Sequence, residues 1–395
     1  MESGSEELEN CAEVIHYGKV IAAFEDYRRY ALTTNNRRRK DFYRLPTQDQ
    51  RLITGYLRKL DEVDDRIRRN ADVLDEVVFK ARDSGLDPST RIRTQDSEDP
   101  PDEALKMETD SESSKSHLVA APVQDIDKVR STLRQFFRDW SKLGETERKA
   151  CYDPILDRLD RFGEDLASSG LLKRDIRVLV PGSGLGRLVW EVSKRGYTAQ
   201  GNEFSYQMLL ASNMVMNHSE CIDQWSIYPF IHSFSNFSNA QDLLMEVKIP
   251  DVLASEVLEI SNFGVSVGDF VEIFNEPDET ENWHAVLTCF FLDTAQNIVQ
   301  YLRTLYKLLK PNGIWINLGP TLWHFEGSAD LNDTSIELDV EELKKLCREV
   351  GFVIEDGSEK SFLTSYSGCP RNNLQQRKSQ KKKKERKKKR KCLIL

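Results

Sequence analysis

The spacing of apolar residues divides the chain into a helical first part and a second part in which short apolar runs alternate with helices. Apolar residues recur at three- and four-residue intervals over 13–34 and 46–82, which predicts amphipathic helices with charged outer faces. The same spacing predicts helices over 126–141 and 145–169. We therefore expect an N-terminal all-helical appendage that forms a lid or cap.

From Ile176 onwards, short β-type runs separate the helical segments. Alternation of strands and helices is typical of a mostly parallel, doubly wound α/β sheet with a Rossmann-like layout. The predicted strands are 176–180, 197–201, 263–270, 284–291, 313–318 and 352–356, and the predicted helices between them are 186–195, 205–217, 294–309 and 339–349.

Composition divides the chain further. Residues 83–123 are rich in Pro, Ser, Asp and Glu and almost free of aromatic and β-branched residues, which predicts a disordered acidic linker. Residues 367–395 predict a disordered polybasic tail. The expected domains are therefore a helical region over 1–82 and an α/β domain over 124–366.

The charge of the chain is unevenly distributed. The run 377–391 contains twelve Lys and Arg against one Glu, whereas the other 380 residues carry 44 Lys and Arg against 64 Asp and Glu. An acidic body disfavours a nucleic-acid-binding fold, so no nucleic acid is expected to be needed for function. Affinity for polyanions, or contact with a membrane, is expected only from the tail.

Targeting and redox features point to a soluble protein. No apolar run reaches the roughly 18 residues of a membrane span, and the acidic N-terminus lacks the apolar region of a secretory signal. The seven cysteines are widely spaced without a CxxC pair, and the six histidines show no ligand spacing. We expect a cytoplasmic protein without disulfides and without a metal site.

A glycine-rich turn follows the first predicted strand, in the segment VLVPGSGLGRLVWE. Gly182, Gly184 and Gly186 permit positive φ and let a ligand lie against bare backbone at the carboxyl end of the strand. Glu203 ends the second predicted strand, where an acidic side chain can accept both hydroxyls of a ribose.

The end of the third predicted strand adds Asp269 and Phe270, an acceptor for an adenine amino group and a ring for stacking. Each also suits a plainer role, a helix-capping acid or a core phenylalanine, but three successive strand ends together favour a nucleoside cofactor. Proline before the first glycine, and Arg187 where a dinucleotide site has its third glycine, favour S-adenosylmethionine. The later turn and strand in LLKPNGIWINLGP are typical of methyltransferases.

A little over half of the chain resembles one family, carnosine N-methyltransferase, which methylates the imidazole of β-alanyl-histidine to give anserine. The resemblance implies a class I methyltransferase fold, S-adenosylmethionine as cofactor, and a small His-containing dipeptide as substrate. It rests on segments in the family's order: STLRQFFRDWS, ACYDPI, VLVPGSGLGRLVWEV, GYTAQGNEFSYQML, YPFIHSFSN, VGDFVEIF, TCFFLDTAQNIVQYL, LKPNGIWINLGPTLWHFE and SIELDVEELK.

The resemblance implies two further cofactor contacts on the helix before the sheet. Arg138 would pair with the cofactor's carboxylate and Gln135 would bond beside it, although Arg138 also fits an ordinary polar face next to Asp139. Cys289 either lines the pocket or is a small buried hydrophobe. The implied cofactor set is Gln135, Arg138, Gly182, Gly184, Gly186, Glu203, Asp269, Phe270 and Cys289.

On the substrate side the resemblance implies Asp293, His324 and Tyr366. A carboxylate at Asp293 would accept the imidazole N–H, fix the tautomer and stabilise the imidazolium that forms. His324 would bond to the ring or the peptide group of the substrate, or it is a structural histidine between Trp323 and Phe325. The family resemblance and the long N-terminal helices also imply a homodimer.

Two segments depart from the family pattern: the linker 83–123, and the sequence after 364–367, where a tyrosine-rich stretch and a closing strand would follow. Two other functions therefore remain open, histidine methylation in a protein and a catalytically impaired cofactor-binding scaffold. The ending Cys392-Leu-Ile-Leu fits geranylgeranylation beside a polybasic run, and that run also fits nuclear localisation or a tail without a selected role.

Overall fold

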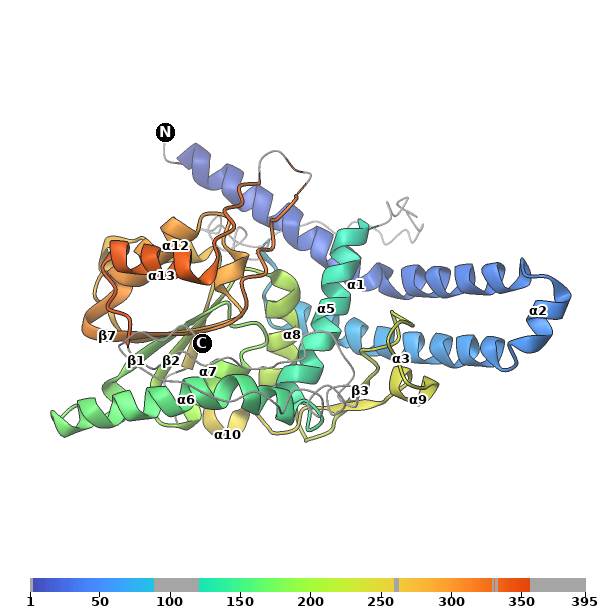
Figure 1. Ribbon diagram of the computed structural model, residues 1–395, viewed down its shortest axis with the longest axis horizontal. Coiled ribbons are helices and arrows are strands. Elements are labelled where there is room, and N and C mark those ends of the chain that lie inside the picture. The colour runs from blue at the N-terminus through green and yellow to red at the C-terminus, as the bar shows by residue number, and fades with distance from the viewer. Residues whose placement is uncertain (1–2, 89–120, 259–262, 329, 331–332, 356–395) are drawn as a thin grey trace, which may run out of the picture.

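The computed structural model describes residues 3–88, 121–258, 263–328, 330 and 333–355 (Figure 1). Tyr366, the polybasic tail and most of the predicted linker lie outside these residues, so those predictions are not tested.

A five-stranded sheet forms the centre of the α/β part, with strand order β5-β2-β1-β6-β7. Every neighbouring pair in it is parallel. The sheet confirms the predicted doubly wound Rossmann-like class. Its strands are β1 (Arg177–Pro181), β2 (Thr198–Glu203), β5 (Phe263–Val267), β6 (Trp283–Cys289) and β7 (Leu309–Leu318).

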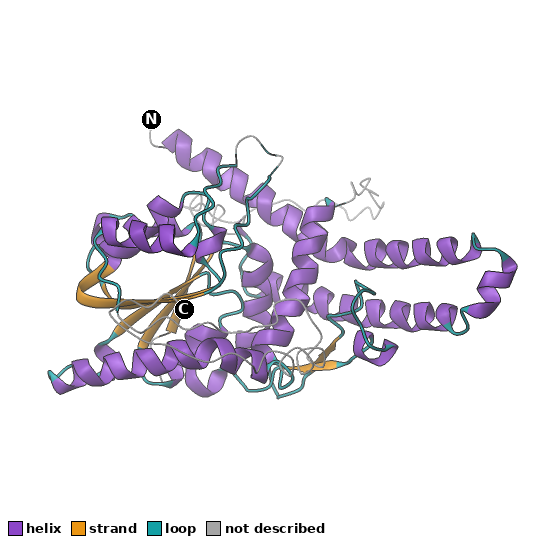
Figure 2. Ribbon diagram, in the orientation of Figure 1, coloured by secondary structure: helices purple, strands orange, loops and turns teal. Residues whose placement is uncertain are grey.

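Helices cover both faces of this sheet (Figure 2). Successive residues of a strand point to opposite faces, so Val178 and Val180 of β1 pack with α6 and α7, while Leu179 packs with α11, α12 and α13. These helices are α6 (Glu145–Ser168), α7 (Arg187–Lys194), α11 (Phe270–Phe274), α12 (Ile298–Leu308) and α13 (Val340–Val350). Shorter elements are α9 (Ala240–Leu243), α10 (Ser255–Leu258), η1 (Lys173–Asp175), η2 (Pro277–Glu279) and η3 (Leu292–Thr294).

The N-terminal helices form a long hairpin that projects from one side of the α/β part (Figure 1). Its base is not a separate unit, because one apolar core joins buried residues of the hairpin to α5 and α8. Val20 and Phe24 of α1, Leu74 of α3, Phe136 of α5 and Leu210 of α8 all belong to this core. The helices are α1 (Ser3–Tyr43), α2 (Thr47–Leu52), α3 (Tyr56–Asp83), α5 (Val123–Trp140) and α8 (Tyr206–Asn217).

Replacing Leu74 with alanine is expected to lower the free energy of unfolding by about 2–5 kcal/mol, because a fully buried side chain leaves a cavity in the shared core. All six tryptophans follow residue 139, outside the hairpin helices. Tryptophan fluorescence in guanidinium chloride therefore reports on the α/β part, including Trp140 and Trp190 of the shared core. The fluorescence midpoint should nevertheless fall in Leu74→Ala. Phe79→Ala, at an exposed position of α3, is the control and should leave the midpoint unchanged. An unchanged midpoint in Leu74→Ala would show that the hairpin unfolds independently.

Several details differ from the predictions. The helix predicted over 46–82 is interrupted at 53–55, where Gly55 has a φ of 83°, and forms α2 and α3 instead. The predicted strand over 352–356 is wrong for its described residues 352–355, which follow α13 without forming a strand. The strand predicted over 263–270 ends at Val267, and a separate helix begins at Phe270. A short antiparallel ribbon of β3 (Trp225–Ile227) and β4 (Val247–Ile249) was not predicted, because three-residue strands carry almost no periodic signal.

None of the helices in the described part of the chain is long and apolar enough to cross a membrane.

Candidate functional site

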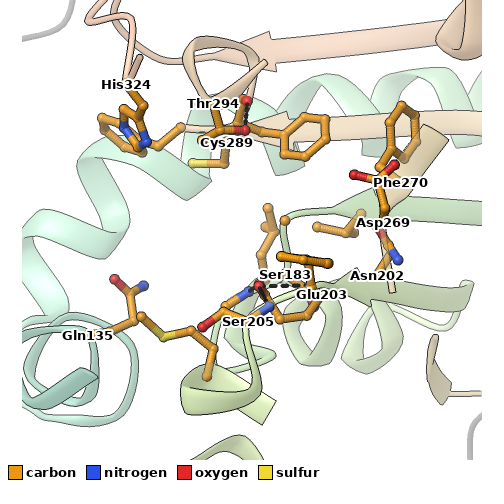
Figure 3. Close-up of a pocket in the computed structure, with 18 of the residues that line it drawn as sticks. Gln135, Ser183, Asn202, Glu203, Ser205, Asp269, Phe270, Cys289, Thr294 and His324 are labelled. Carbon is orange, nitrogen blue, oxygen red and sulfur yellow. Dashed lines mark hydrogen bonds between the residues drawn. The ribbon is translucent and has the colours of Figure 1, made fainter. Parts of the chain in front are cut away.

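A cavity of about 1100 Å³ lies at the carboxyl ends of the central strands, between α5, α8 and the segments that follow β5 and β6 (Figure 3). In an open parallel sheet this edge is where ligands bind. Nine of the predicted site residues line the cavity: Gln135, Arg138, Gly182, Gly184, Glu203, Asp269, Phe270, Cys289 and His324. His16 of α1 also lines it, so the N-terminal helix reaches the site.

The glycine turn between β1 and α7 brings backbone to the cavity wall. Gly182 and Gly184 both have positive φ, of 65° and 55°. A Cβ on Gly182 would lie 2.6 Å from Cδ2 of Phe291, so a larger residue there is blocked by conformation and by space. Gly186 does not line the cavity, which differs from its predicted role as a cofactor contact. It caps α7 at φ 79°, and a Cβ there would meet Sδ of Met216 at 2.6 Å.

Glu203 joins the glycine turn to the end of β2. Its carboxylate accepts N–H groups of Gly184 at 2.7 Å, Phe204 at 3.0 Å and Ser205 at 2.9 Å. Burial raises the pKa of Glu203, and the three backbone donors act in the opposite direction. Glu203 therefore presents a strong acceptor beside the bare backbone of the turn.

Asp269 and Phe270 occupy the far end of the cavity from His324 (Figure 3). Asp269 also caps α11, because its Oδ1 accepts the N–H groups of Val271 at 2.8 Å and Glu272 at 3.1 Å. Phe270 is buried, with its ring edge-on to Phe291 at a centroid distance of 5.3 Å. Asp269 is thus both a helix cap and a cavity-lining residue, and Phe270 is both a core residue and a cavity-lining residue.

The α5 wall holds an acid that sequence analysis did not assign to the site. Asp139 is buried on the cavity wall and accepts bonds from Nε2 of Gln135 at 2.9 Å and from the hydroxyl of Tyr152 at 3.0 Å. Nε of Arg138 lies 3.2 Å from Oε1 of Glu147 on α6. The wall therefore offers a cation and a carboxylate side by side.

A buried ionic network lies behind this wall. Asp251 pairs with Arg148, and its other oxygen lies 2.6 Å from Arg187. Both arginines also bind carbonyl groups of α5 or its end: Arg148 donates to Arg138, and Arg187 donates to Asp139 at 2.8 Å. The network holds the cavity-lining end of α5 against the sheet. Its signal in sequence was weak, because these residues come from distant elements.

Asp139→Asn is expected to change how stability depends on pH. Burial, the largest influence, raises the pKa of Asp139 in the folded protein, so the carboxyl group contributes stability at low pH that is lost as the pH rises through that raised pKa. Asparagine does not titrate. The Tm of the variant minus that of the parent should therefore increase as the pH rises above the ordinary Asp pKa of about 4, measured by calorimetry. A difference independent of pH would contradict this.

At the substrate end, His324 lines the cavity whereas Asp293 does not. Asp293 was predicted to contact the substrate, but it is only 4% exposed, whereas the next residue, Thr294, does line the cavity. The N–H of His324 donates to the carbonyl of Asp293 at 2.9 Å, which holds the two segments together. Oδ1 of Asp293 is buried with no hydrogen-bond partner. Burial raises the pKa of Asp293, and the nearby His324 acts to lower it.

Cys289 faces the cavity from the end of β6, and burial raises the pKa of its thiol well above the ordinary value. A protonated thiol is a poor metal ligand and a weak nucleophile. Among the described residues there is also no group of three His, Cys, Asp or Glu side chains that could hold a metal ion.

S-adenosylmethionine fits the groups on this wall. Two polar atoms of cavity-lining residues are buried without partners among the described residues, Oγ of Ser183 in the glycine turn and Nε2 of Gln207. Such atoms are costly unless a ligand satisfies them. Together with the parallel sheet, the positive-φ glycines and Glu203, they define an S-adenosylmethionine-dependent methyltransferase.

Comparison with known proteins narrows this class. A family model described as Carnosine N-methyltransferase matches residues 115–387. The chain is 36% identical to carnosine N-methyltransferase of Rattus norvegicus over 92% of this chain and 84% of the rat protein. It is 35% identical to that of Schizosaccharomyces pombe over 90% of this chain and 91% of the yeast protein. The chain belongs to the carnosine N-methyltransferase family, as its motifs predict.

A solved structure with weaker similarity is phosphoethanolamine N-methyltransferase 2 of Haemonchus contortus in complex with S-adenosyl-L-methionine. It is 15% identical, the match covers 56% of this chain and 42% of that chain, and the TM-score is 0.30.

Proposed function

We propose that this chain transfers the methyl group of S-adenosylmethionine to an imidazole nitrogen of carnosine, giving anserine, and also methylates related small His-containing peptides. The observation that carries the proposal is one cavity, in a member of this family, with nucleoside-type contacts at one end and His324 backed by Asp293 at the other.

The proposed cofactor contacts follow from the chemistry of each wall. Glu203 would accept the ribose hydroxyls, and Asp269 and Phe270 would flank the adenine. At the α5 wall, the guanidinium of Arg138 would face the cofactor's carboxylate, and Asp139 would face its ammonium group. When bound there, S-adenosylmethionine supplies an electrophilic methyl group.

The substrate imidazole must be neutral, with a lone pair on one nitrogen and a proton on the other. The unpartnered Oδ1 of Asp293 is a suitable acceptor for that N–H, and its negative charge would stabilise the imidazolium that forms during transfer. His324 would hold the ring or the peptide group from the cavity wall. Most of the rate would then come from orientation rather than from a strong base.

The proposal is tested by incubating the full chain with labelled S-adenosylmethionine and carnosine, and in parallel with a His-containing protein and with β-alanyl-lysine. Label is expected in carnosine and not in β-alanyl-lysine, which has no imidazole. Label in the protein alone would favour protein histidine methylation. No transfer, with cofactor binding still measurable by calorimetry, would favour the catalytically impaired scaffold.

We also propose a homodimer formed through the tip of the helical hairpin. Apolar side chains are exposed there, with Tyr43 at 62% and Leu52 at 82%, which is unusual for a surface that stays free. Light scattering at micromolar concentration should give twice the chain mass, and Leu52→Glu should reduce it. A monomer mass for the parent would exclude the dimer.

Cytoplasmic and nuclear localisation, and membrane attachment through Cys392, stay predictions from the sequence alone.

A further inference from the structure

Cationic side chains gather where α1, α3, α5 and the loop between β3 and β4 meet. This basic cluster comprises Arg38, Lys59, Arg130 and Arg134, near His232 of the loop, and Arg66, whose guanidinium lies 5.4 Å from the ring centroid of Tyr228 in the same loop. Figure 1 shows these four segments meeting on the hairpin side of the molecule. None of the six residues lines the cavity described above.

Aromatic rings hold several of these cations in place. The guanidinium of Arg38 lies 4.0 Å from the ring centroid of Phe234, and Nζ of Lys59 lies 4.9 Å from the same centroid. Arg38 also donates to the carbonyl of His232 at 3.0 Å. Arg130 lies over the ring of Tyr30 at 5.1 Å. Cation–π contacts orient a cation and leave its charge in place.

The charge of the basic cluster is almost uncompensated. Among the described residues, only Arg130 of its five cations has a carboxylate partner, Asp127 at 2.7 Å. Nε atoms of Arg66 and Arg130 are buried without any hydrogen-bond acceptor. The neighbouring Arg39 shows the usual arrangement, since it pairs with both Asp61 and Asp64 at 2.6 Å. Within the described part of the chain, four of the five cations in the cluster thus lack a carboxylate partner, although the whole chain has nine more acidic than basic residues.

The pKa values of several residues in the cluster are also lowered, as expected for positive charges that lack carboxylate partners. Burial lowers the pKa of Arg134 and of Lys59, and neighbouring arginines lower both further. Burial also lowers the pKa of His232, with Arg130, Arg134 and Arg38 adding to the effect. Arg134 is the most exposed of the five cations, and the other four are half-buried. Like charges this close to one another destabilise the fold unless an anion joins them.

We propose that the basic cluster is a binding site for a multivalent oxyanion, separate from the methyltransferase cavity. Guanidinium groups match the oxygens of phosphate and carboxylate in paired hydrogen bonds, and the buried Nε atoms of Arg66 and Arg130 are donors that such a ligand would satisfy. Arg134 and Arg138 lie one helical turn apart on α5, and Arg138 lines the cavity. An anion bound in the cluster would thus lie next to the cofactor wall.

The test is calorimetric titration of the full chain with tripolyphosphate, and separately with citrate, at low ionic strength. The parent should show a saturable site that Arg134→Gln and Arg38→Gln each weaken about tenfold. The control is Arg68→Gln, an exposed α3 residue paired with Asp65, which should bind as the parent does. Binding to the lysine-rich run 377–391 is the same in all variants and cancels in the comparison. Stronger binding of tripolyphosphate than of citrate assigns a phosphate-bearing ligand, and the reverse assigns a carboxylate-bearing one.

Thermal unfolding provides an independent readout. Because Arg134 adds to a repulsive cluster, Arg134→Gln should raise the Tm without anion, whereas a structural arginine would lower it when removed. Tripolyphosphate should raise the Tm of the parent more than that of the variant. Equal binding and equal Tm shifts in parent, Arg134→Gln and Arg68→Gln would overturn the proposal.

Discussion

Asp293→Asn is expected to lower kcat for methyl transfer to carnosine by about a hundredfold or more, with the Kd for S-adenosylmethionine nearly unchanged. The variant keeps the size of the side chain but loses the negative charge that would stabilise the imidazolium. Its amide can also turn an N–H toward the substrate N–H, so that two donors face each other and no hydrogen bond forms. Initial rates with labelled cofactor and calorimetric binding measure the two effects separately.

The thermal stability of Asp293→Asn, unlike its kcat, should not fall. Burial raises the pKa of Asp293, so its charged form destabilises the fold at neutral pH, and the neutral asparagine should leave the Tm equal to or above that of the parent. Asp278→Asn, at an exposed position of η2, is the matched control for rate and Tm. A kcat within a few fold of the parent would remove Asp293 from the proposed mechanism.

Glu203→Gln should weaken S-adenosylmethionine binding about 10- to 100-fold. The carboxylate now accepts three backbone N–H groups and would also accept ribose hydroxyls, and an amide retains only one acceptor oxygen for all of them. The carnosine KM, extrapolated to saturating cofactor, should change little because Glu203 lies away from His324 (Figure 3).

The control for this variant is Glu276→Gln, an exposed acid in the loop after α11. It should bind the cofactor as the parent does. A Glu203→Gln protein with unaltered cofactor affinity would show that the glycine turn and β2 do not form the ribose site.

The sheet and its ligand edge could be predicted because their signals are local. The central strands β1 and β6 are short, largely apolar runs buried on both faces, and Gly182 and Gly184 indicate the positive φ values that the glycine turn requires. Glu203 follows from its place at the next strand end. Nine predicted residues therefore line one cavity.

The other features of the site could not be predicted from the sequence, because they depend on contacts between distant segments. Asp139 stood in the sequence only as the neighbour of Arg138, and nothing local shows that Gln135 and Tyr152 enclose it. The pairing of Arg138 with Glu147 is likewise set by how α5 packs on α6. Asp293 follows β6 as predicted, but the short η3 turn buries it one residue away from the wall.

The basic cluster is even harder to predict from the sequence. Its cations come from three helices and oppose the acidic character of the body, so net charge over the sequence conceals them. Only the packing of α1, α3 and α5 around His232 reveals a site for an anion.

The most direct measurement is the position of the transferred methyl group. The full chain is incubated with carnosine and S-adenosylmethionine carrying a ¹³C-methyl group, and the product is analysed by NMR. We expect one labelled methyl on a ring nitrogen of the imidazole, formed at least about a hundredfold more slowly by Asp293→Asn. A methyl group on the amino group of carnosine, or no label in carnosine while the cofactor binds, would contradict this expectation.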